Sequence, residues 1–225
     1  MCGRFSLTAS NEGLVNYFGL ARGLTLEPRY NIAPTQPVAA VRAEGGERRL
    51  VLLRWGLIPF WADDAKIGYR MINARAETAH KTPAFRAAFR GRRCLIPASG
   101  FYEWDKKGGS RQPYNIRRAD GKPLALAGLW ERWEGEEGKT VIESCTILTT
   151  AASEPVSRLH ERMPVILEPE HFELWLDPGE QWVERLRELM EPVTPGVLEM
   201  YPVSSYVNKA GSEGGEVRWG GGIGW

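Results

Sequence analysis

Five strand-like segments between residues 94 and 149 restrict this chain to a fold rich in β-structure. They are Cys94–Ile96, Phe101–Trp104, Tyr114–Arg117, Leu124–Trp133 and Val141–Thr149. Glycine-containing turns at residues 107–110, 120–121 and 135–138 separate them. A further hairpin is predicted from Val38–Arg42 and Leu50–Trp55, around the turn at residues 44–47. The centre of the chain is therefore expected to form sheets rather than a helical bundle.

Helices are expected on both sides of this strand-rich region. The predicted helices are Ser10–Leu20, Pro83–Phe89, Glu170–Leu176 and Glu180–Met190, and a last strand is expected near Met200–Val203. No repeat and no Pro/Ser-rich linker divides the sequence, so we predict a single α+β domain over residues 1–208. Residues 209–225 are rich in glycine and are predicted to form a flexible tail.

Cysteine usage and hydropathy indicate where a chain of this kind resides. Cys2, Cys94 and Cys145 form no CxxC pair and are odd in number, which argues against a disulfide framework and for a reducing compartment. The sequence contains no zinc-binding pattern, no signal peptide and no apolar stretch of the ~18 residues that a membrane span needs. We therefore expect a soluble cytoplasmic protein that uses no metal and no cofactor.

Positive charge is concentrated in one segment, although the net charge of the chain is only +1. Residues 54–93 contain nine Lys/Arg against three Asp/Glu, whereas residues 94–225 contain fourteen against twenty-one. The basic segment comprises Arg54, Lys66, Arg70, Arg75, Lys81, Arg86, Arg90, Arg92 and Arg93, interleaved with Trp55, Phe60, Trp61, Tyr69 and Phe85. Cations alternating with aromatic rings are typical of single-stranded nucleic-acid binding. A plain solvated surface has the same composition, so charge alone leaves both interpretations open.

The second residue of the chain carries a distinct chemical possibility. Removal of Met1 would leave Cys2 with a free α-amine and a thiol on neighbouring carbons. An amine alone forms a hydrolysable imine with an aldehyde, but the thiol can then close a five-membered thiazolidine. The reference pKa values of the two groups are roughly 7.7–8.0 and 8.5, so part of each is nucleophilic near neutral pH. The competing interpretation is that Cys2 is a small buried hydrophobic residue.

Three polar residues elsewhere in the chain are candidates to assist such chemistry. His160 precedes the apolar run Val165–Leu167 and can move protons near neutral pH. Glu103 lies between Tyr102 and Trp104 in a predicted strand, so its side chain points away from both rings. Asn73 can donate and accept hydrogen bonds without titrating. Each of the three, taken alone, is also compatible with an ordinary structural role.

Several ordered blocks of the sequence together resemble one protein family. The blocks are Met1–Phe5, Tyr30–Thr35, Arg54–Pro59, Ile72–Thr78, Arg92–Pro97 with Gly100–Trp104, Ala125–Trp130 and His160–Pro164. This arrangement is similar to the SOS-response-associated peptidase, or SRAP, family of abasic-site processing proteins. The resemblance runs from residue 1 to about residue 208 and leaves out the glycine-rich end. It implies a β-rich domain in which barrel-like sheets are flanked by short helices and a basic groove.

The resemblance also implies an activity and a set of site residues. Cys2, freed of Met1, would bond covalently to the ring-opened aldehyde of an abasic site in single-stranded DNA, with Asn73, Glu103 and His160 around it. A weak abasic-site lyase reaction is an expected side reaction. The expected DNA contacts are Arg4, Asn31, Pro34, Trp55, Gly56, Trp61, Arg75 and Arg86. We expect a monomer that associates with the nucleoid when it is bound to damaged DNA.

Two other functions stay open at the level of sequence. In a cysteine peptidase or other N-terminal-nucleophile hydrolase, Cys2 would attack an amide, and Glu103 or His160 would act as the base. No oxyanion hole is identifiable from the sequence for that reaction. A non-catalytic single-strand binder would account for the arginines and tryptophans, but not for Cys2 together with Asn73, Glu103 and His160.

Overall fold

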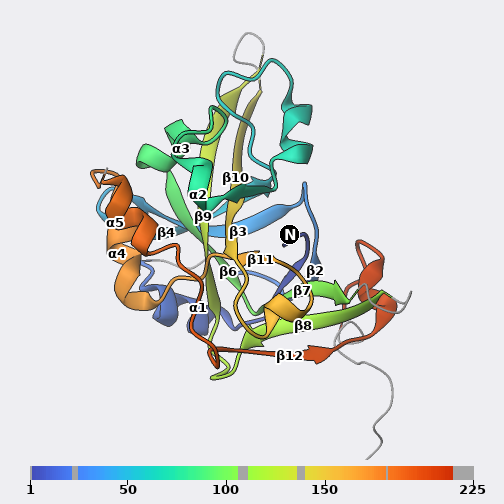
Figure 1. The fold of residues 1–225 in the computed structure, drawn as a ribbon. Helices are drawn as coiled ribbons and strands as arrows, with labels where there is room; N and C mark the ends of the chain where they lie inside the picture. Colours follow the sequence, from blue (N-terminus) through green and yellow to red (C-terminus); the bar gives the residue numbers. More distant parts are fainter. Residues whose placement is uncertain (1, 22–24, 106–110, 136–139, 181, 215–225) are drawn as a thin grey trace, which may run out of the picture.

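A strand barrel forms the centre of the computed structural model, which describes residues 2–21, 25–105, 111–135, 140–180 and 182–214. Its strands are β3 (Pro37–Glu44), β4 (Glu47–Trp55), β6 (Arg93–Ala98), β9 (Leu124–Glu134) and β10 (Val141–Ala151). Neighbours pair in the order β4-β3-β6-β9-β10, and β10 returns to β4 in parallel register. The ring therefore closes, as Figure 1 shows. Closure gives every barrel strand a neighbour on both sides.

Two short strands extend the barrel where β10 ends. β5 (Asn73–Arg75) runs parallel to β10, with Asn73 opposite Ile147. β11 (Arg162–Pro164) runs antiparallel to β10, with Arg162 opposite Ala151. The first half of β10 pairs with β9 and β4, which leaves its last residues for these two strands. The segments that carry Asn73 and His160 are thus attached to the same end of one strand.

A second, five-stranded antiparallel sheet lies beside the barrel. In spatial order its strands are β12 (Leu198–Pro202), β8 (Gln112–Arg118), β7 (Gly100–Asp105), β1 (Phe5–Leu7) and β2 (Arg29–Ile32). Side chains alternate between its two faces. Phe101 joins the main hydrophobic core, whereas Tyr102 packs with Val203 and Val207 on the other face. We call the face of the sheet that carries Phe101 the inner face, and the face that carries Tyr102 the outer face.

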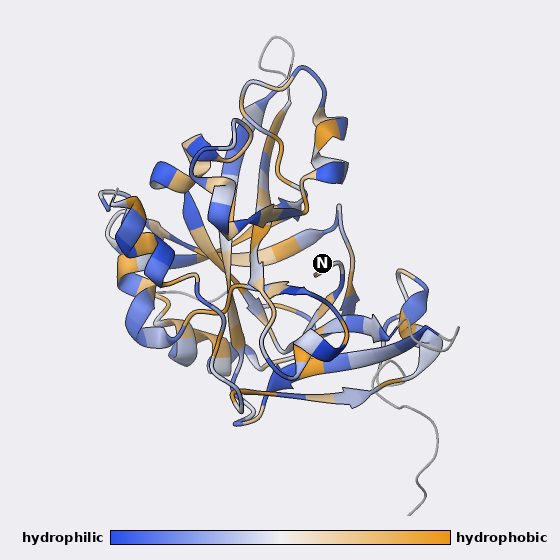
Figure 2. Cartoon of the chain, viewed as in Figure 1, coloured by the Kyte–Doolittle hydropathy of each residue, from blue (hydrophilic) through white to orange (hydrophobic). Residues whose placement is uncertain are grey.

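Short helices surround the two sheets. They are α1 (Asn11–Phe18), α2 (Ala76–Ala79), α3 (Arg86–Gly91), α4 (Phe172–Leu176) and α5 (Val183–Glu188), with 3-10 turns η1 (Ala65–Arg70), η4 (Val156–Arg158), η5 (Pro169–His171) and η6 (Ser205–Asn208). Ser10 caps α1 by accepting from the Gly13 backbone N–H. Figure 2 shows hydrophobic residues concentrated along the barrel strands. Among the described residues, no helix is long and apolar enough to cross a membrane.

The predicted α+β class, rich in strands with few short helices, is confirmed. All five central strands and the hairpin at residues 44–47 are present, each slightly longer than predicted. The predicted helix at 83–89 begins only at Arg86, and the one at 180–190 is limited to Val183–Glu188. Strands β1, β2, β5 and β11 were not predicted, because three or four residues are too few for a periodic pattern.

The end of the predicted domain extends slightly past residue 208. The Lys209 backbone oxygen accepts from Asn31, and the Glu213 carboxylate accepts from the Tyr30 backbone N–H. These contacts attach the first residues of the expected tail to β2. Residues 215–225, which hold most of its glycines, lie outside the described residues.

Candidate functional site

Cys2 lies between the two sheets and is fully buried. Its backbone oxygen accepts a hydrogen bond from Asn73 Nδ2 at 2.9 Å, which connects it to β5 beside the barrel. Two residues later, the Arg4 backbone oxygen accepts from the Tyr102 N–H at 2.9 Å, which connects the same segment to β7. Residues 2–4 therefore bridge the barrel and the five-stranded sheet, and the position of Cys2 is fixed from both sides.

Asn73 has one polar atom left for a ligand. Its Nδ2 is used by the Cys2 backbone oxygen, but its Oδ1 is buried and has no hydrogen-bond partner in the described part of the chain. A buried amide oxygen without a partner is costly, because its hydration is lost and nothing replaces it. An acceptor of this kind next to Cys2 is suited to a hydroxyl or an amine proton of a bound molecule.

Glu103 reaches the same place from the other sheet. It lies on β7 between Tyr102, which is buried on the outer face, and Trp104, which packs with the same outer cluster. Alternation along the strand therefore directs Glu103 to the inner face, away from both rings. The side chain is only 6% exposed, and its charge acts on the Cys2 thiol. The structure thus brings Cys2, Asn73 and Glu103 together.

The surroundings of Cys2 keep its thiol protonated. Burial, and after it the negative charge of Glu103, raise the pKa of the thiol from its ordinary value of 9.0 to about 12. The positive charge of the amino terminus on residue 1 and, after it, a hydrogen bond from the Arg4 backbone N–H act in the opposite direction and do not compensate. At neutral pH the sulfur is therefore a thiol.

His160 lies on the connection between η4 and β11 and is partly buried. Its backbone N–H donates to the Val156 oxygen at 3.0 Å, and its Nδ1 accepts from the Arg162 backbone N–H at 2.9 Å. Because Nδ1 accepts, a neutral ring carries its proton on Nε2. Nε2 is then the nitrogen that can deliver or receive a proton.

An ion pair that sequence reasoning missed holds the His160 segment in place. Arg162 makes two hydrogen bonds with the Glu77 carboxylate, at 2.6 and 2.9 Å, and it also contacts the Thr149 backbone oxygen. Arginine and carboxylate fit one another in this two-bond geometry. Both residues lie within blocks of the family resemblance, at 72–78 and 160–164, but nothing in the sequence indicates that they pair.

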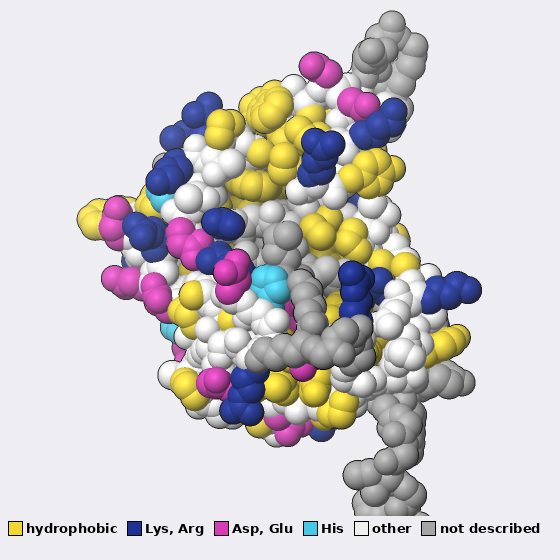
Figure 3. Space-filling view, turned by 45° about the vertical axis from the view of Figure 1, so that its right-hand side comes forward, with side chains coloured by type: hydrophobic (Ala, Val, Ile, Leu, Met, Phe, Trp, Pro, Cys, Tyr) yellow, Lys and Arg dark blue, Asp and Glu magenta, His cyan; other side chains and the backbone are white. Residues whose placement is uncertain are grey.

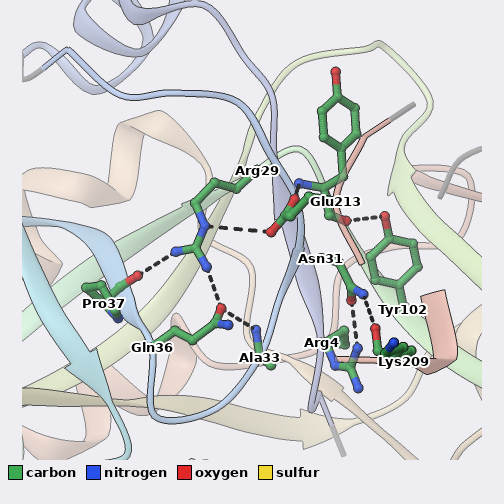
Figure 4. A network of polar contacts seen from close by, with 10 residues as sticks. Arg4, Arg29, Asn31, Ala33, Gln36, Pro37, Tyr102, Lys209 and Glu213 are labelled. Atoms are coloured by element: carbon green, nitrogen blue, oxygen red, sulfur yellow. Dashed lines mark hydrogen bonds and ion pairs between the residues drawn. The ribbon is translucent and has the colours of Figure 1, made fainter. Parts of the chain in front are cut away.

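Arg4 and Asn31 belong to one polar network (Figure 4). Arg4 donates to Asn31 Oδ1 at 2.7 Å and to the Val207 backbone oxygen at 2.9 Å. Asn31 is fully buried and donates to the backbone oxygens of Val207 and Lys209. Arg29 in the same view contacts Gln36 and the Pro37 oxygen. In this structure, Arg4 and Asn31 hold the start of β1 against the segment around η6.

Trp55 and Gly56 are buried parts of the scaffold in this conformation. Trp55 packs edge-to-face on Phe5 at 5.2 Å and donates from its indole to the Ile72 oxygen. Gly56 has φ of 126°, and a Cβ there would lie 2.5 Å from the Gly68 backbone oxygen. Only glycine permits this approach. The ring of Trp55 therefore contacts Phe5 in the core rather than solvent.

Three exposed aromatic residues project from the loop that begins at Gly56. Phe60, Trp61 and Tyr69 are 56%, 49% and 59% exposed. The Arg54 guanidinium lies 5.3 Å from the Tyr69 ring centre, within cation–π range. Figure 3 shows basic and hydrophobic side chains intermixed over one face of the molecule. Exposed rings beside cations provide surfaces on which bases can stack. Phe85, which is also part of the basic segment, is buried and provides no such surface.

The basic segment divides into arginines that serve the fold and arginines that face solvent. Arg93 is 3% exposed and donates to backbone oxygens of Phe89, Trp175 and Glu180, while Arg92 pairs with Glu131 at 2.6 Å. Arg75 and Arg86 are exposed, and Pro34 is half-buried in the turn before β3. Arg75 follows Asn73 by two residues in β5, so both side chains leave the same face of that strand.

Metal ligation has no candidate in the part of the chain that the structure describes. No group of three His, Cys, Asp or Glu side chains there is arranged to hold an ion. Cys94 and Cys145 are fully buried within the barrel strands. Burial raises the pKa of both thiols, so they are protonated and serve packing.

Comparison with known proteins identifies the family of the chain. Residues 1–210 match the family model described as SOS response associated peptidase (SRAP). The chain belongs to the SRAP family. The Bacillus subtilis protein YoqW, named an abasic site processing protein, is 42% identical over 214 residues, covering 92% of this chain and 94% of its own. The chicken (Gallus gallus) protein HMCES, with the same description, is 34% identical and matches over 62% of its length.

Solved structures of similar proteins share the fold. A Bacteroides thetaiotaomicron protein superimposes with a TM-score of 0.87 at 25% identity, covering 97% of this chain and all of its own. A Bordetella bronchiseptica protein gives a TM-score of 0.77 at 30% identity, covering 90% of this chain and all of its own. The barrel and the adjoining sheet are therefore an SRAP architecture.

Proposed function

We propose that this protein captures abasic sites in single-stranded DNA by forming a covalent thiazolidine through Cys2 after Met1 has been removed. One observation carries the proposal: Asn73 Nδ2 lies 2.9 Å from the Cys2 backbone oxygen, while Glu103 acts on the thiol of the same residue from the opposite sheet. The family membership supports it, because the curated relatives are named abasic site processing proteins.

The first step is attack by the α-amine. A ring-opened abasic deoxyribose presents an aldehyde at C1′. Glu103 takes the proton that the ammonium must lose first, and the Cys2 nitrogen then adds to this carbon. Glu103 returns that proton to the hydroxyl of the carbinolamine, which also accepts a hydrogen bond from His160 Nε2–H, and water leaves to give an iminium. Asn73 Oδ1, which lacks a partner in the described structure, accepts a hydrogen bond from the sugar or the amine.

The second step is ring closure by sulfur. Burial of the sulfur and the negative charge of Glu103 disfavour a thiolate at this position, so we assign the first attack to nitrogen. The sulfur adds to C1′ once the iminium has formed, and its proton passes to Glu103. The product is a five-membered ring, and one water is lost overall. If closure fails, the iminium acidifies C2′ and permits elimination of the 3′ phosphate, which is the expected weak lyase reaction.

Single-strand binding is attributed to the exposed surface rather than to the buried residues. The Arg75 side chain extends from the same face of β5 as Asn73. Arg86 and Trp61, which lie within fifteen residues of Asn73 in the sequence, are also exposed. Rings on that surface stack on bases next to the lesion, and the arginines contact phosphates. We assign Trp55, Gly56 and Asn31 to holding the site in shape, because each is buried.

The peptidase alternative finds less support in the site. A cysteine peptidase needs a thiolate, and such enzymes lower the pKa of the nucleophilic thiol. In this chain with Met1 attached, burial and the charge of Glu103 raise the pKa of the Cys2 thiol instead. An amine-first reaction tolerates a protonated thiol, whereas amide attack by sulfur does not.

A denaturing gel tests the proposal. The purified protein is incubated with a single-stranded oligonucleotide that contains one abasic site, and with the same oligonucleotide carrying an intact base. We expect a shifted band only with the abasic strand, and none with Cys2→Ala. Turnover of a peptide without any shifted band would favour the hydrolase. Retention on a native gel alone would favour a binder without covalent chemistry.

A further inference from the structure

A cavity lies on the outer face of the five-stranded sheet, opposite the face that carries Glu103. Its volume is ≈ 220 Å³, and its lining includes Ser6, Ser99, Asn115, Arg117, Lys122 and Tyr201. Ser6 lies in β1, four residues after Cys2, a separation of about 13 Å in an extended chain. The cavity is therefore distinct from the Cys2 site.

The pairing of the strands explains why polar residues gather there. Asn115 is opposite both Tyr102 on β7 and Tyr201 on β12, and residues directly opposite one another share a face. Gly100 of β7 is paired with Ser6 of β1. A Cβ at Gly100 would lie 2.3 Å from Asn115 Oδ1. Glycine at this position therefore leaves room for the buried amide at the wall of the cavity.

The lining offers cations and hydroxyls but no carboxylate. The three cations are Arg117, Arg118 and Lys122. Arg118 uses three of its nitrogens on Asp120 and Glu168, so it is a structural residue. Arg117 uses only Nε, on Glu199, and Lys122 is 63% exposed with a long 3.7 Å contact to Asp120. Arg117 and Lys122 thus keep N–H groups for an anion.

The hydroxyls at the cavity have complementary roles. Ser99 Oγ accepts from the backbone N–H groups of Thr8 and Ala9, at 2.8 and 3.1 Å. Both of its lone pairs are therefore used, and it can contact a ligand only as a donor. Ser6 donates to the Gly100 oxygen at 3.4 Å and keeps lone pairs to accept from a ligand hydroxyl. The site therefore combines donors for an anion with an acceptor for a hydroxyl.

We propose that this cavity binds a phosphate monoester that carries hydroxyl groups, with Arg117, Lys122 and Ser99 holding the phosphate. A monoester carries nearly two negative charges at neutral pH and three acceptor oxygens, which matches two cations and a hydroxyl donor. Water occupies roughly 30 Å³ per molecule in the liquid, so the cavity has room for a ligand replacing about seven waters, more than phosphate alone. The ester is either a free sugar phosphate or the 5′-phosphate end of a DNA strand.

Calorimetry with ribose 5-phosphate tests this site, with ribose and inorganic phosphate as reference probes. We expect ribose 5-phosphate to bind at least tenfold more tightly than either. Arg117→Ala should weaken it at least tenfold, and Lys122→Ala at least threefold. The matched control is Arg49→Ala, an exposed arginine of the β3–β4 hairpin whose loss should leave binding unchanged.

Several results distinguish the ligand source or overturn the site. Competition by an oligonucleotide with a 5′-phosphate, but not by one with a 5′-hydroxyl, identifies a strand end; absence of competition identifies a free ester. Binding that Lys122→Ala and Arg117→Ala leave unchanged, or no ribose 5-phosphate binding at all, refutes the proposal. Lys122 is exposed, so that variant keeps the test valid if Arg117→Ala does not fold. Cys2→Ala should not alter this binding, so the result is independent of the covalent chemistry.

Discussion

The Cys2 site and the exposed loop after Gly56 differ in burial, in hydrogen bonding and in the charge that surrounds them. Cys2 is fully buried, bonded from both sides and next to a carboxylate, whereas Phe60, Trp61 and Tyr69 project into solvent. Buried groups act by exact position and by shifted proton affinities, while exposed rings and cations act by contact area and charge. The comparison therefore predicts that chemistry and binding can be altered separately.

The largest expected effect is loss of the covalent product in Cys2→Ala. This change removes the sulfur, so only a hydrolysable imine can form, and no stable adduct should survive denaturation. Affinity for the intact single strand should change less than twofold, because the side chain is buried. Cys2→Ser serves as the matched variant and should give a more labile linkage. Full, stable crosslinking by Cys2→Ala would break the separation between the two regions.

The reactivity of Cys2 towards iodoacetamide should also be strongly depressed. While Met1 is attached, burial and Glu103 raise the pKa of the thiol from 9.0 to about 12, so in that form of the protein the thiolate fraction at neutral pH is roughly a thousandfold lower than for an ordinary thiol. Thiolate appears only as pH rises towards the raised pKa, so alkylation should accelerate from pH 8 to 10 without a plateau. Glu103→Gln removes a charge that raises the pKa and should speed alkylation. A plateau below pH 9 would show an unperturbed thiol.

Asn73→Ala should slow crosslinking by about ten- to a hundredfold, the range expected when a reacting group loses its positioning. It removes the donor to the Cys2 backbone oxygen and the acceptor Oδ1 together. Asn73→Asp keeps an acceptor and loses the donor, so it separates the two contributions. The measurement is the single-turnover rate at saturating DNA. A reduced affinity with an unchanged rate would assign Asn73 to binding instead.

Trp61→Ala should weaken noncovalent binding to single strands by roughly 1–3 kcal/mol, the typical value for one stacked base. Trp182, which is 76% exposed on the edge of α5, provides a matched control for the loss of an exposed indole. Fluorescence anisotropy with an undamaged oligonucleotide measures both. Equal losses of affinity in the two variants would show that the loop after Gly56 is not a specific binding surface for single strands.

The smallest expected effect is on the salt dependence. Neutralising one phosphate-contacting arginine should reduce the slope of log affinity against log salt by about 0.7 for a single strand. Arg75→Gln and Arg86→Gln should each show this change, while the crosslinking rate at saturating DNA stays constant. Arg49→Gln, which changes an exposed arginine of the β3–β4 hairpin, is the control. Unchanged slopes for both variants would place the DNA path elsewhere.

Sequence reasoning succeeded where a short local rule sufficed. Alternation between Tyr102 and Trp104 predicted the orientation of Glu103, and the glycine pair at residues 45–46 predicted the hairpin. It could not separate Arg93 from Arg86, because a run of arginines does not show which one folds back onto backbone oxygens. Nor could it place Trp55 in the core, since burial there depends on Phe5, fifty residues earlier.

Contacts between segments far apart in the sequence could not be predicted from sequence patterns either. The Arg4 contact to Val207 joins positions 203 residues apart, and the Arg162 pair with Glu77 spans 85. The outer-face cavity combines β1, β8, β12, Ser99 before β7 and the turn at Gly121. None of these arrangements leaves a periodic trace, because each arises only when the sheets assemble.

Intact-mass spectrometry of the crosslinked product tests the central claim most directly. Thiazolidine formation through Cys2 predicts a species whose mass equals the chain without Met1 plus the abasic oligonucleotide, minus one water, and fragmentation should locate the bond at Cys2. A crosslinked product that still contains Met1, or one joined at a lysine or another cysteine, would contradict the account.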